Sequence, residues 1–149
     1  MRTMRIAVAA TVMLVAVPAE AQEELPRGTV EGGLSQFGVS IAGISFTHTG
    51  FYAGATGRFH DRGEVFGAFS QIEGQSFAQA GAQLRLGPDH WIARPGARGG
   101  ILYADGGTRV TGGFAVRVGR QYGGLWSADY TTVEGLLVRV VHIGGYYGF

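Results

Sequence analysis

The chain has 149 residues, no cysteine and a formal net charge of +1, and all of its cations are arginines. This length fits one domain, the lack of cysteine excludes disulfides and thiolate metal sites, and the near-neutral charge argues against a nucleic-acid partner. Glycine accounts for 27 residues, well above its usual share of about 7%, which favours closely curved sheets.

The first 21 residues have the three parts of a secretory signal peptide. Arg2 and Arg5 charge its start, an uncharged run over 6–17 follows, and Ala19 and Ala21 flank an acidic residue at a cleavage site. The apolar run of 12 residues is too short to span a bilayer as a helix. We expect export and cleavage after Ala21, with an uncleaved anchor as the alternative.

Beyond this segment, polar and apolar residues alternate in eight stretches, which is the pattern of short strands. Turn residues separate several stretches, as at Thr49-Gly50, Asp61-Arg62-Gly63, Glu73-Gly74-Gln75, Gly87-Pro88-Asp89 and Asp105-Gly106-Gly107. The expected strands are 37–48, 51–59, 64–72, 77–86, 98–104, 109–119, 124–133 and 136–149. Because no stretch shows a helical period, any membrane-embedded form has to be a closed barrel.

The alternation gives these strands one apolar and one polar face. Leu84 and Val116 lie on apolar faces, whereas Gln83 and Arg117 lie on polar ones. A soluble barrel turns its apolar faces inward and a membrane barrel turns them outward, so alternation alone leaves both open. Small polar residues beside arginine, and aromatic rings at strand ends, favour the membrane form. The rings assigned to interfacial girdles are Phe51, Phe59, Phe77, Trp126, Tyr146, Tyr147 and Phe149, with ordinary core packing as the alternative.

The polar faces predict a charged network inside the barrel. Its candidate cations are Arg58, Arg85, Arg109 and Arg117, and its candidate carboxylates are Glu64, Asp129 and Glu134. Paired charges would fill an eight-stranded lumen and make a plug rather than a pore. The alternative is that several of these side chains are solvated at strand ends.

Two features do not fit a regular membrane barrel. The longest join, over 87–97, falls on the same side as the N-terminus, whereas membrane barrels usually have their long loops on the opposite side. Either a strand is miscounted near 29–37 or 91–100, or the other loops are unusually small. Arg139 falls on the lipid-facing side of the last strand, where we expect a bulge or a shifted register.

The sequence gives little support for a catalytic or metal-binding site. The four histidines, His48, His60, His90 and His142, form no metal-binding spacing, and no nucleophile motif is present. We therefore expect no catalytic residue, no metal and no cofactor.

The last eight residues, 142–149, end on two aromatic residues of one strand face. They resemble the C-terminal signal by which Gram-negative outer-membrane β-barrels are recognised for assembly, at His142, Gly144, Tyr147 and Phe149. In pattern the whole exported chain resembles the small outer-membrane β-barrel proteins, a broad group of porin-like and surface-antigen-like barrels. The lipid A deacylases among small barrels have a serine directly after a His-x element near the C-terminus, but Ile143 and Gly144 follow His142 here.

This resemblance implies an all-β protein, an antiparallel up-and-down transmembrane barrel of about eight strands in the cell outer membrane. The expected organisation is a signal peptide over 1–21, a lead-in over 22–36 and a barrel over 37–149. Outer-membrane lipids and the barrel-assembly machinery are the implied partners. We expect a non-enzymatic structural or surface-interaction role with an unknown ligand. The alternatives are an exported soluble barrel that binds a small apolar ligand and a lipid-modifying outer-membrane enzyme.

Overall fold

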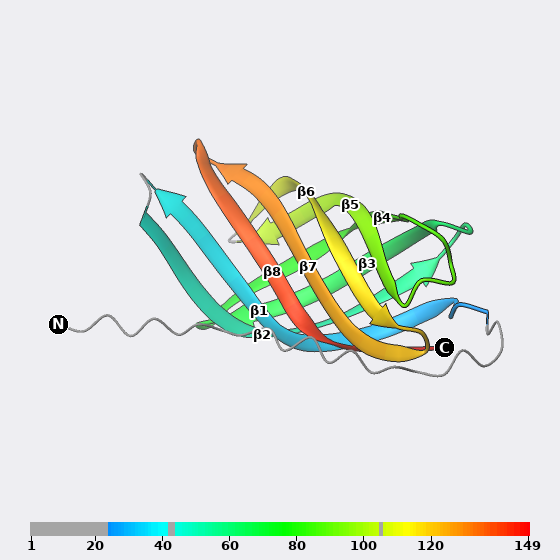
Figure 1. Cartoon of the computed structure of the whole chain (residues 1–149). Coiled ribbons are helices and arrows are strands. Elements are labelled where there is room, and N and C mark those ends of the chain that lie inside the picture. Colours follow the sequence, from blue (N-terminus) through cyan, green and yellow to red (C-terminus); the bar gives the residue numbers. More distant parts are fainter. Residues whose placement is uncertain (1–23, 42–43, 105) are drawn as a thin grey trace.

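The computed structural model describes residues 24–41, 44–104 and 106–149, and these form a closed antiparallel barrel (Figure 1). Each strand pairs with its neighbours in sequence, and the last pairs with the first. The strands are β1 (Gly28–Ile41), β2 (Ile44–Arg58), β3 (Gly63–Ile72), β4 (Gln75–Arg85), β5 (Ala93–Ala104), β6 (Gly107–Gly119), β7 (Tyr122–Val133) and β8 (Leu136–Gly148). The predicted signal peptide lies outside the described residues. In the described part of the chain, no helix is long and apolar enough to cross a membrane.

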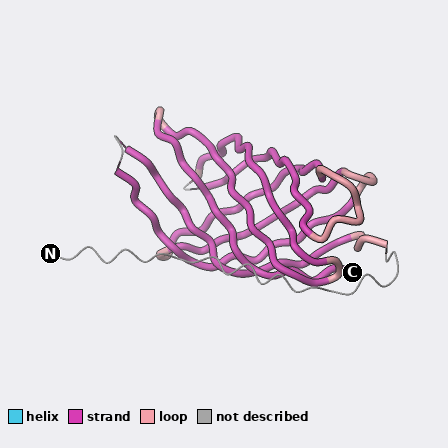
Figure 2. Tube along the Cα trace, in the orientation of Figure 1, coloured by secondary structure: helices cyan, strands magenta, loops and turns pink. Residues whose placement is uncertain are grey.

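The two ends of the barrel differ in their joins (Figure 2). The terminal end carries the start of β1, the end of β8 and the longest join, over 86–92. At the opposite end, here called the turn end, β3–β4 and β7–β8 are joined by Glu73-Gly74 and Glu134-Gly135, and all four turn residues have positive φ. Such two-residue turns match the twist of antiparallel strands. The loops at the turn end are therefore unusually small, and the predicted number of strands is correct.

The predicted start of the barrel is wrong. The stretch 37–48 contains the end of β1 and the beginning of β2, and Thr49-Gly50 lies inside β2 rather than in a turn. β1 begins at Gly28, within the predicted lead-in, and β5 begins at Ala93 instead of residue 98. Glycines in β1 and Pro95 in β5 weaken the alternation, because glycine carries no side chain to reveal a face and proline is rare in strands.

The prediction that apolar faces of the strands point outward and polar faces point into the lumen is confirmed. Leu84 and Tyr147 on the outer surface are each 53% exposed, whereas Asp129 and His142 inside the barrel are each 1% exposed. Two predicted girdle rings are exceptions, because Phe77 and Tyr146 are buried inside. Alternate residues of a strand face opposite sides of the sheet, and Phe77 in β4 and Tyr146 in β8 occupy inward-facing positions. The prediction considered only that these rings lie near strand ends and not which side they face.

Arg139 lies on the outer side of β8 without a bulge. The pairing of β8 with β1 and with β7 runs without interruption through Gly38↔Arg139 and Tyr130↔Arg139. The prediction of a bulge or shifted register is wrong. Arg139 is the fourth residue of β8, near the turn end, and its side chain is exposed, so that its long aliphatic stem can carry the charge toward water.

Facing glycines allow the strands to curve tightly. A Cβ on Gly144 would lie 2.9 Å from the Cα of Gly33 in β1 and closer still to the carbonyl oxygen of Gly32. Gly81 of β4 and Gly100 of β5 approach each other in the same way. Only glycine has the space for such close backbone approach inside the barrel.

Candidate functional site

The interior of the barrel is the candidate site, and its centre is an arginine held by two carboxylates. Arg117 of β6 places Nη1 2.6 Å from Oε2 of Glu64 and Nη2 3.5 Å from Oε2 of Glu31. Gln83 donates a further hydrogen bond of 2.9 Å to Glu64. These side chains come from four different strands, β1, β3, β4 and β6, so the network ties opposite walls of the barrel together.

A second ion pair lies further toward the turn end. Nε of Arg98 lies 3.1 Å from Oδ1 of Asp129, and both side chains are almost completely buried. The contact has ion-pair distance but lacks good hydrogen-bond geometry at either atom, so we treat it as electrostatic. The Arg98 guanidinium also lies over the ring of Phe66, 3.7 Å from its centroid, a favourable cation–π arrangement.

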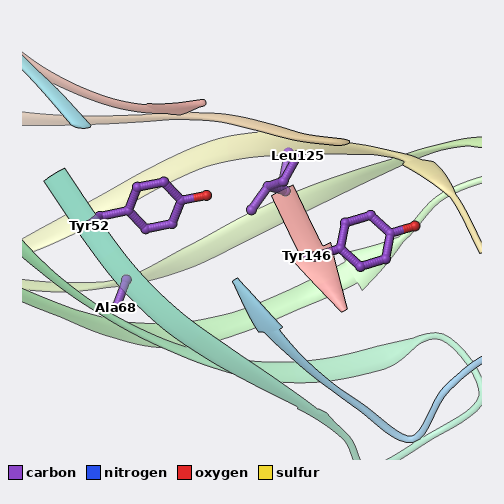
Figure 3. Packing of buried hydrophobic residues seen from close by; sticks show 5 residues of the cluster. Tyr52, Ala68, Leu125 and Tyr146 are labelled. Atoms are coloured by element: carbon purple, nitrogen blue, oxygen red, sulfur yellow. The ribbon is translucent and has the colours of Figure 1, made fainter. Parts of the chain in front are cut away.

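Next to this pair, aromatic rings and a serine fill the lumen. The imidazole of His142 stacks on Tyr52 with ring centroids 4.3 Å apart, and its Nε2 lies 3.1 Å from Oγ of Ser70. Tyr52 and Tyr146 both extend into the space enclosed by the strands (Figure 3). The lumen is therefore occupied by side chains, as expected for eight strands.

An apolar cluster closes the lumen at the turn end. Phe37 stacks on Phe77 with centroids 5.1 Å apart, and the two rings pack with buried aliphatic side chains. The other members of this cluster are Ile72, Leu102, Val140 and Ala104. The interior therefore passes from charged to apolar along the barrel axis.

The terminal end of the lumen is rich in arginine. Arg94 donates a 3.0 Å hydrogen bond to the hydroxyl of Tyr146, which donates in turn to the carbonyl oxygen of Arg120 at 3.2 Å. Arg85 donates to the carbonyl oxygen of Asp61 and lies 3.4 Å from Oδ1 of Asp89.

The structure brings together most of the predicted charged network. Glu64, Arg85, Arg117 and Asp129 are buried inside, and Arg58 is partly buried at the terminal end, 3.8 Å from Glu24. Arg109 and Glu134 are exposed at the turn end and lie outside the network, so these two assignments are wrong. Both residues lie at or beside two-residue turns, where side chains are solvated.

Three members of the network were not predicted. Glu31 lies in the part of β1 that was assigned to the lead-in, and Arg94 precedes the predicted start of its strand. Arg98 was inside a predicted strand but was not assigned to a face. Extending the alternation of β5 backward from Leu102 would have placed both arginines on the inward side.

Three of the histidines, His48, His60 and His90, are exposed, and His142 is buried in the lumen. His48 is exposed, with Nδ1 2.6 Å from Glu73. The Ser70–His142 contact has the distance of a nucleophile and its base, but both groups are sealed in the lumen beneath the apolar cluster. Within the described residues, no group of three histidine, cysteine or acidic side chains is arranged to hold a metal ion.

The four assembly-signal residues divide between the two faces of β8. His142 and Gly144 point inward, whereas Tyr147 and the C-terminal residue Phe149 are exposed outside. Backbone hydrogen bonds connect Phe149 to Gly28 in both directions, at 2.9 and 3.1 Å. These residues therefore also close the barrel, and their role as a signal stays a prediction.

Comparison with known proteins shows the fold. No protein-family profile matches the chain, and no curated protein sequence matches it either. Three solved structures match 85% of this chain and all of their own: Ail, the attachment invasion locus protein of Yersinia pestis, at 15% identity and a TM-score of 0.56; Neisserial surface protein A, at 14% and 0.60; and the N-terminal β-barrel domain of Pseudomonas aeruginosa OprF, at 11% and 0.59. The chain has the fold of the small eight-stranded outer-membrane β-barrel proteins.

Proposed function

We propose that this protein is an integral outer-membrane barrel with a structural or surface-interaction role. The observation that carries the proposal is the inverted distribution of polarity: apolar side chains cover the outside and paired charges fill the inside. Outside, Val110, Phe51 and Tyr122 are each more than 70% exposed, and such a surface is stable against hydrocarbon rather than water.

The alternative of an apolar-ligand carrier fits the interior poorly. A carrier of that kind needs an apolar cavity, whereas the middle of this lumen contains Arg98, Arg117 and three carboxylates. The burial of His142, which is 1% exposed, likewise gives no support to a lipid-modifying enzyme, because a catalytic group has to be reached by its lipid substrate.

A surface-interaction role is supported by an extension at the turn end. Pairing between β2 and β3 stops at Gly50↔Ile72, so 44–49 of β2 pair only with β1. The end of β1 and the beginning of β2 lie at the upper left of Figure 1. Ile44 and Phe46, which continue the inward side of β2, are 62% and 53% exposed there. This free strand edge and its apolar face are a natural place for a partner to bind.

The barrel orientation is assigned from the termini, because the longest join, over 86–92, lies at the terminal end and by itself would favour the opposite orientation. With the termini in the periplasm, as outer-membrane barrels have them, the turn end and its extension face the cell exterior. Outer-membrane lipids would surround the apolar belt, and the barrel-assembly machinery would insert the chain by recognising 142–149.

Cell fractionation combined with gel mobility tests this proposal. We expect the protein in the outer-membrane fraction, with a faster unboiled band that shifts on heating, because folded barrels resist denaturation by detergent. Release with the periplasmic contents, or a single heat-independent band, would contradict the proposal. Altered lipid A on expression that disappears in a His142→Ala variant would instead support the enzyme.

A further inference from the structure

Five arginines surround a small cavity at the terminal end of the lumen. The cavity holds about 20 Å³ of free space and is lined by Arg27, Arg58, Arg85, Arg94 and Arg117, with Glu64 as its one carboxylate. Residues Leu25 and Pro26, which precede β1, cover part of its mouth. This charge is concentrated at one end of the molecule, whereas the chain as a whole is nearly neutral.

Among the described residues, the charges in this cavity are only partly balanced. Glu64 already accepts from Arg117 and Gln83, so its charge is compensated. Arg94 is 7% exposed, and its one hydrogen-bond partner among the described residues is the neutral hydroxyl of Tyr146. Its Nη1 is buried without a partner in the same part of the chain, as is Nε of Arg85. A buried guanidinium without a counter-charge is costly.

The carboxylates at the rim of the cavity are weak competitors for a ligand. Glu24 lies 3.8 Å from Arg58 and Asp89 lies 3.4 Å from Arg85, and these acidic side chains are 82% and 65% exposed. Exposed ion pairs of this kind contribute little. A ligand entering from the rim can therefore replace them without exposing a buried charge.

We propose that this cavity binds one small oxyanion, a phosphate or a carboxylate group. Arg94 supplies the free Nη1 at the back of the cavity, Arg85 supplies Nε, and Arg58 closes the site from the rim. Guanidinium groups match the paired oxygens of these anions. The paired hydroxyls of Thr29 and Thr56, 2.7 Å apart in the cavity wall, add polar lining. Because the volume is small, we expect a larger ligand to enter with only its charged end.

Calorimetric titration of the refolded exported chain tests this site. Inorganic phosphate and acetate are titrated separately, at constant ionic strength, into protein in phosphatidylcholine nanodiscs. We expect saturable one-site binding of at least one anion. Arg94→Gln should weaken it by about tenfold or more, the effect of losing a charge-assisted hydrogen bond. Arg58→Gln should weaken it less, because that side chain is partly solvated.

Arg109→Gln is the matched control, since it removes the same charge at the opposite end. We expect it to bind like the unaltered protein, and heat-dependent gel mobility verifies that each variant is folded. If Arg94→Gln does not fold, Arg58→Gln and Arg85→Gln provide the comparison. Absence of saturable binding, or equal losses in Arg109→Gln and the cavity variants, would overturn the proposal.

The lipid composition of the nanodisc distinguishes a soluble anion from a lipid headgroup as the source of the bound oxyanion. Repeating the titration in phosphatidylglycerol nanodiscs should leave the affinity unchanged if the site takes a soluble anion. Loss of the calorimetric signal there alone would mean that an anionic lipid headgroup, rather than a soluble anion, supplies the oxyanion that the cavity binds. Neither outcome depends on the surface role proposed above, which concerns the other end of the barrel.

Discussion

At the scale of single residues, the stability of the barrel depends on charges that compensate one another inside it. Arg117 is the common partner of Glu31 and Glu64, so its removal leaves two carboxylates buried without their cation. By contrast, an exposed arginine such as Arg109 contributes little. The same type of substitution should therefore have very different effects at the two positions.

Replacing Arg117 with methionine should lower the free energy of unfolding by about 3–5 kcal/mol, because breaking a buried pair strands the remaining charges. Urea unfolding of the refolded protein in vesicles, followed by tryptophan fluorescence, measures this. Adding Glu31→Gln and Glu64→Gln to the same variant should restore most of the loss, since neither of these two positions then carries a buried carboxylate without its cation. If the triple variant is no more stable than Arg117→Met, the charges are not the reason for the loss.

The close backbone contact of Gly144 with β1 gives a second prediction for a single residue. Gly144→Ala would push a methyl group against the backbone of Gly32 and Gly33 and should destabilise the barrel by about 1–3 kcal/mol through overpacking. Gly145→Ala is the control, because its Cβ would lie 3.5 Å from the Gly123 carbonyl oxygen, at ordinary contact distance. The same urea titration compares them, and equal stability of the two variants would show that the strands can move apart.

At the scale of the strands, β8 joins the end of the chain to its beginning. The backbone of Phe149 bonds to Gly28 and Arg27, whereas its ring is 69% exposed on the outer surface. Deleting Phe149 would remove both its exposed ring and its backbone hydrogen bonds. A side-chain substitution separates the ring, which the assembly machinery would recognise, from the backbone bonds that close the barrel.

Phe149→Ala should reduce the assembled fraction in cells while export stays normal, so unassembled protein should accumulate in the periplasm. In detergent, the purified variant should refold like the unaltered chain, because its backbone bonds remain. Heat-dependent mobility of both samples gives the measurement. Phe51→Ala, which removes an equally exposed ring from β2, should assemble normally; equal defects would mean that any lost surface ring has this effect.

How well each strand could be predicted depended on its side chains. In β4, Leu84 and Gln83 alternate clearly, and both the position and the sides of the strand were correct. In β1, Gly32 and Gly33 interrupt the pattern, so little in the local sequence distinguishes the strand from a lead-in, and its second partner, β8, lies at the far end of the sequence. The ion partners of Arg117 were likewise out of reach, since pairing across the lumen depends on barrel closure and not on sequence spacing.

At the scale of the whole molecule, the fold places charge inside and hydrocarbon-compatible side chains outside. The two tryptophans sample different depths of this arrangement. Trp126 lies in the middle of β7 on the outer face and contacts Phe114 edge-on at 5.0 Å, whereas Trp91 lies in the long join at the terminal end. The fluorescence of Trp126 therefore reports on the apolar outer surface in the middle of the barrel, and that of Trp91 reports on the terminal end.

Lipids brominated near the middle of their acyl chains should quench Trp126 strongly and Trp91 weakly, because quenching requires close contact. The measurement uses Trp91→Phe to isolate Trp126 and Trp126→Phe to isolate Trp91, both refolded into the same vesicles. Bromines near the headgroup should reverse the order, since Trp91 lies closer to the membrane surface. If Trp126 is not quenched at either depth, the apolar face of β7 does not contact lipid, and the barrel would have to cover this face with protein instead.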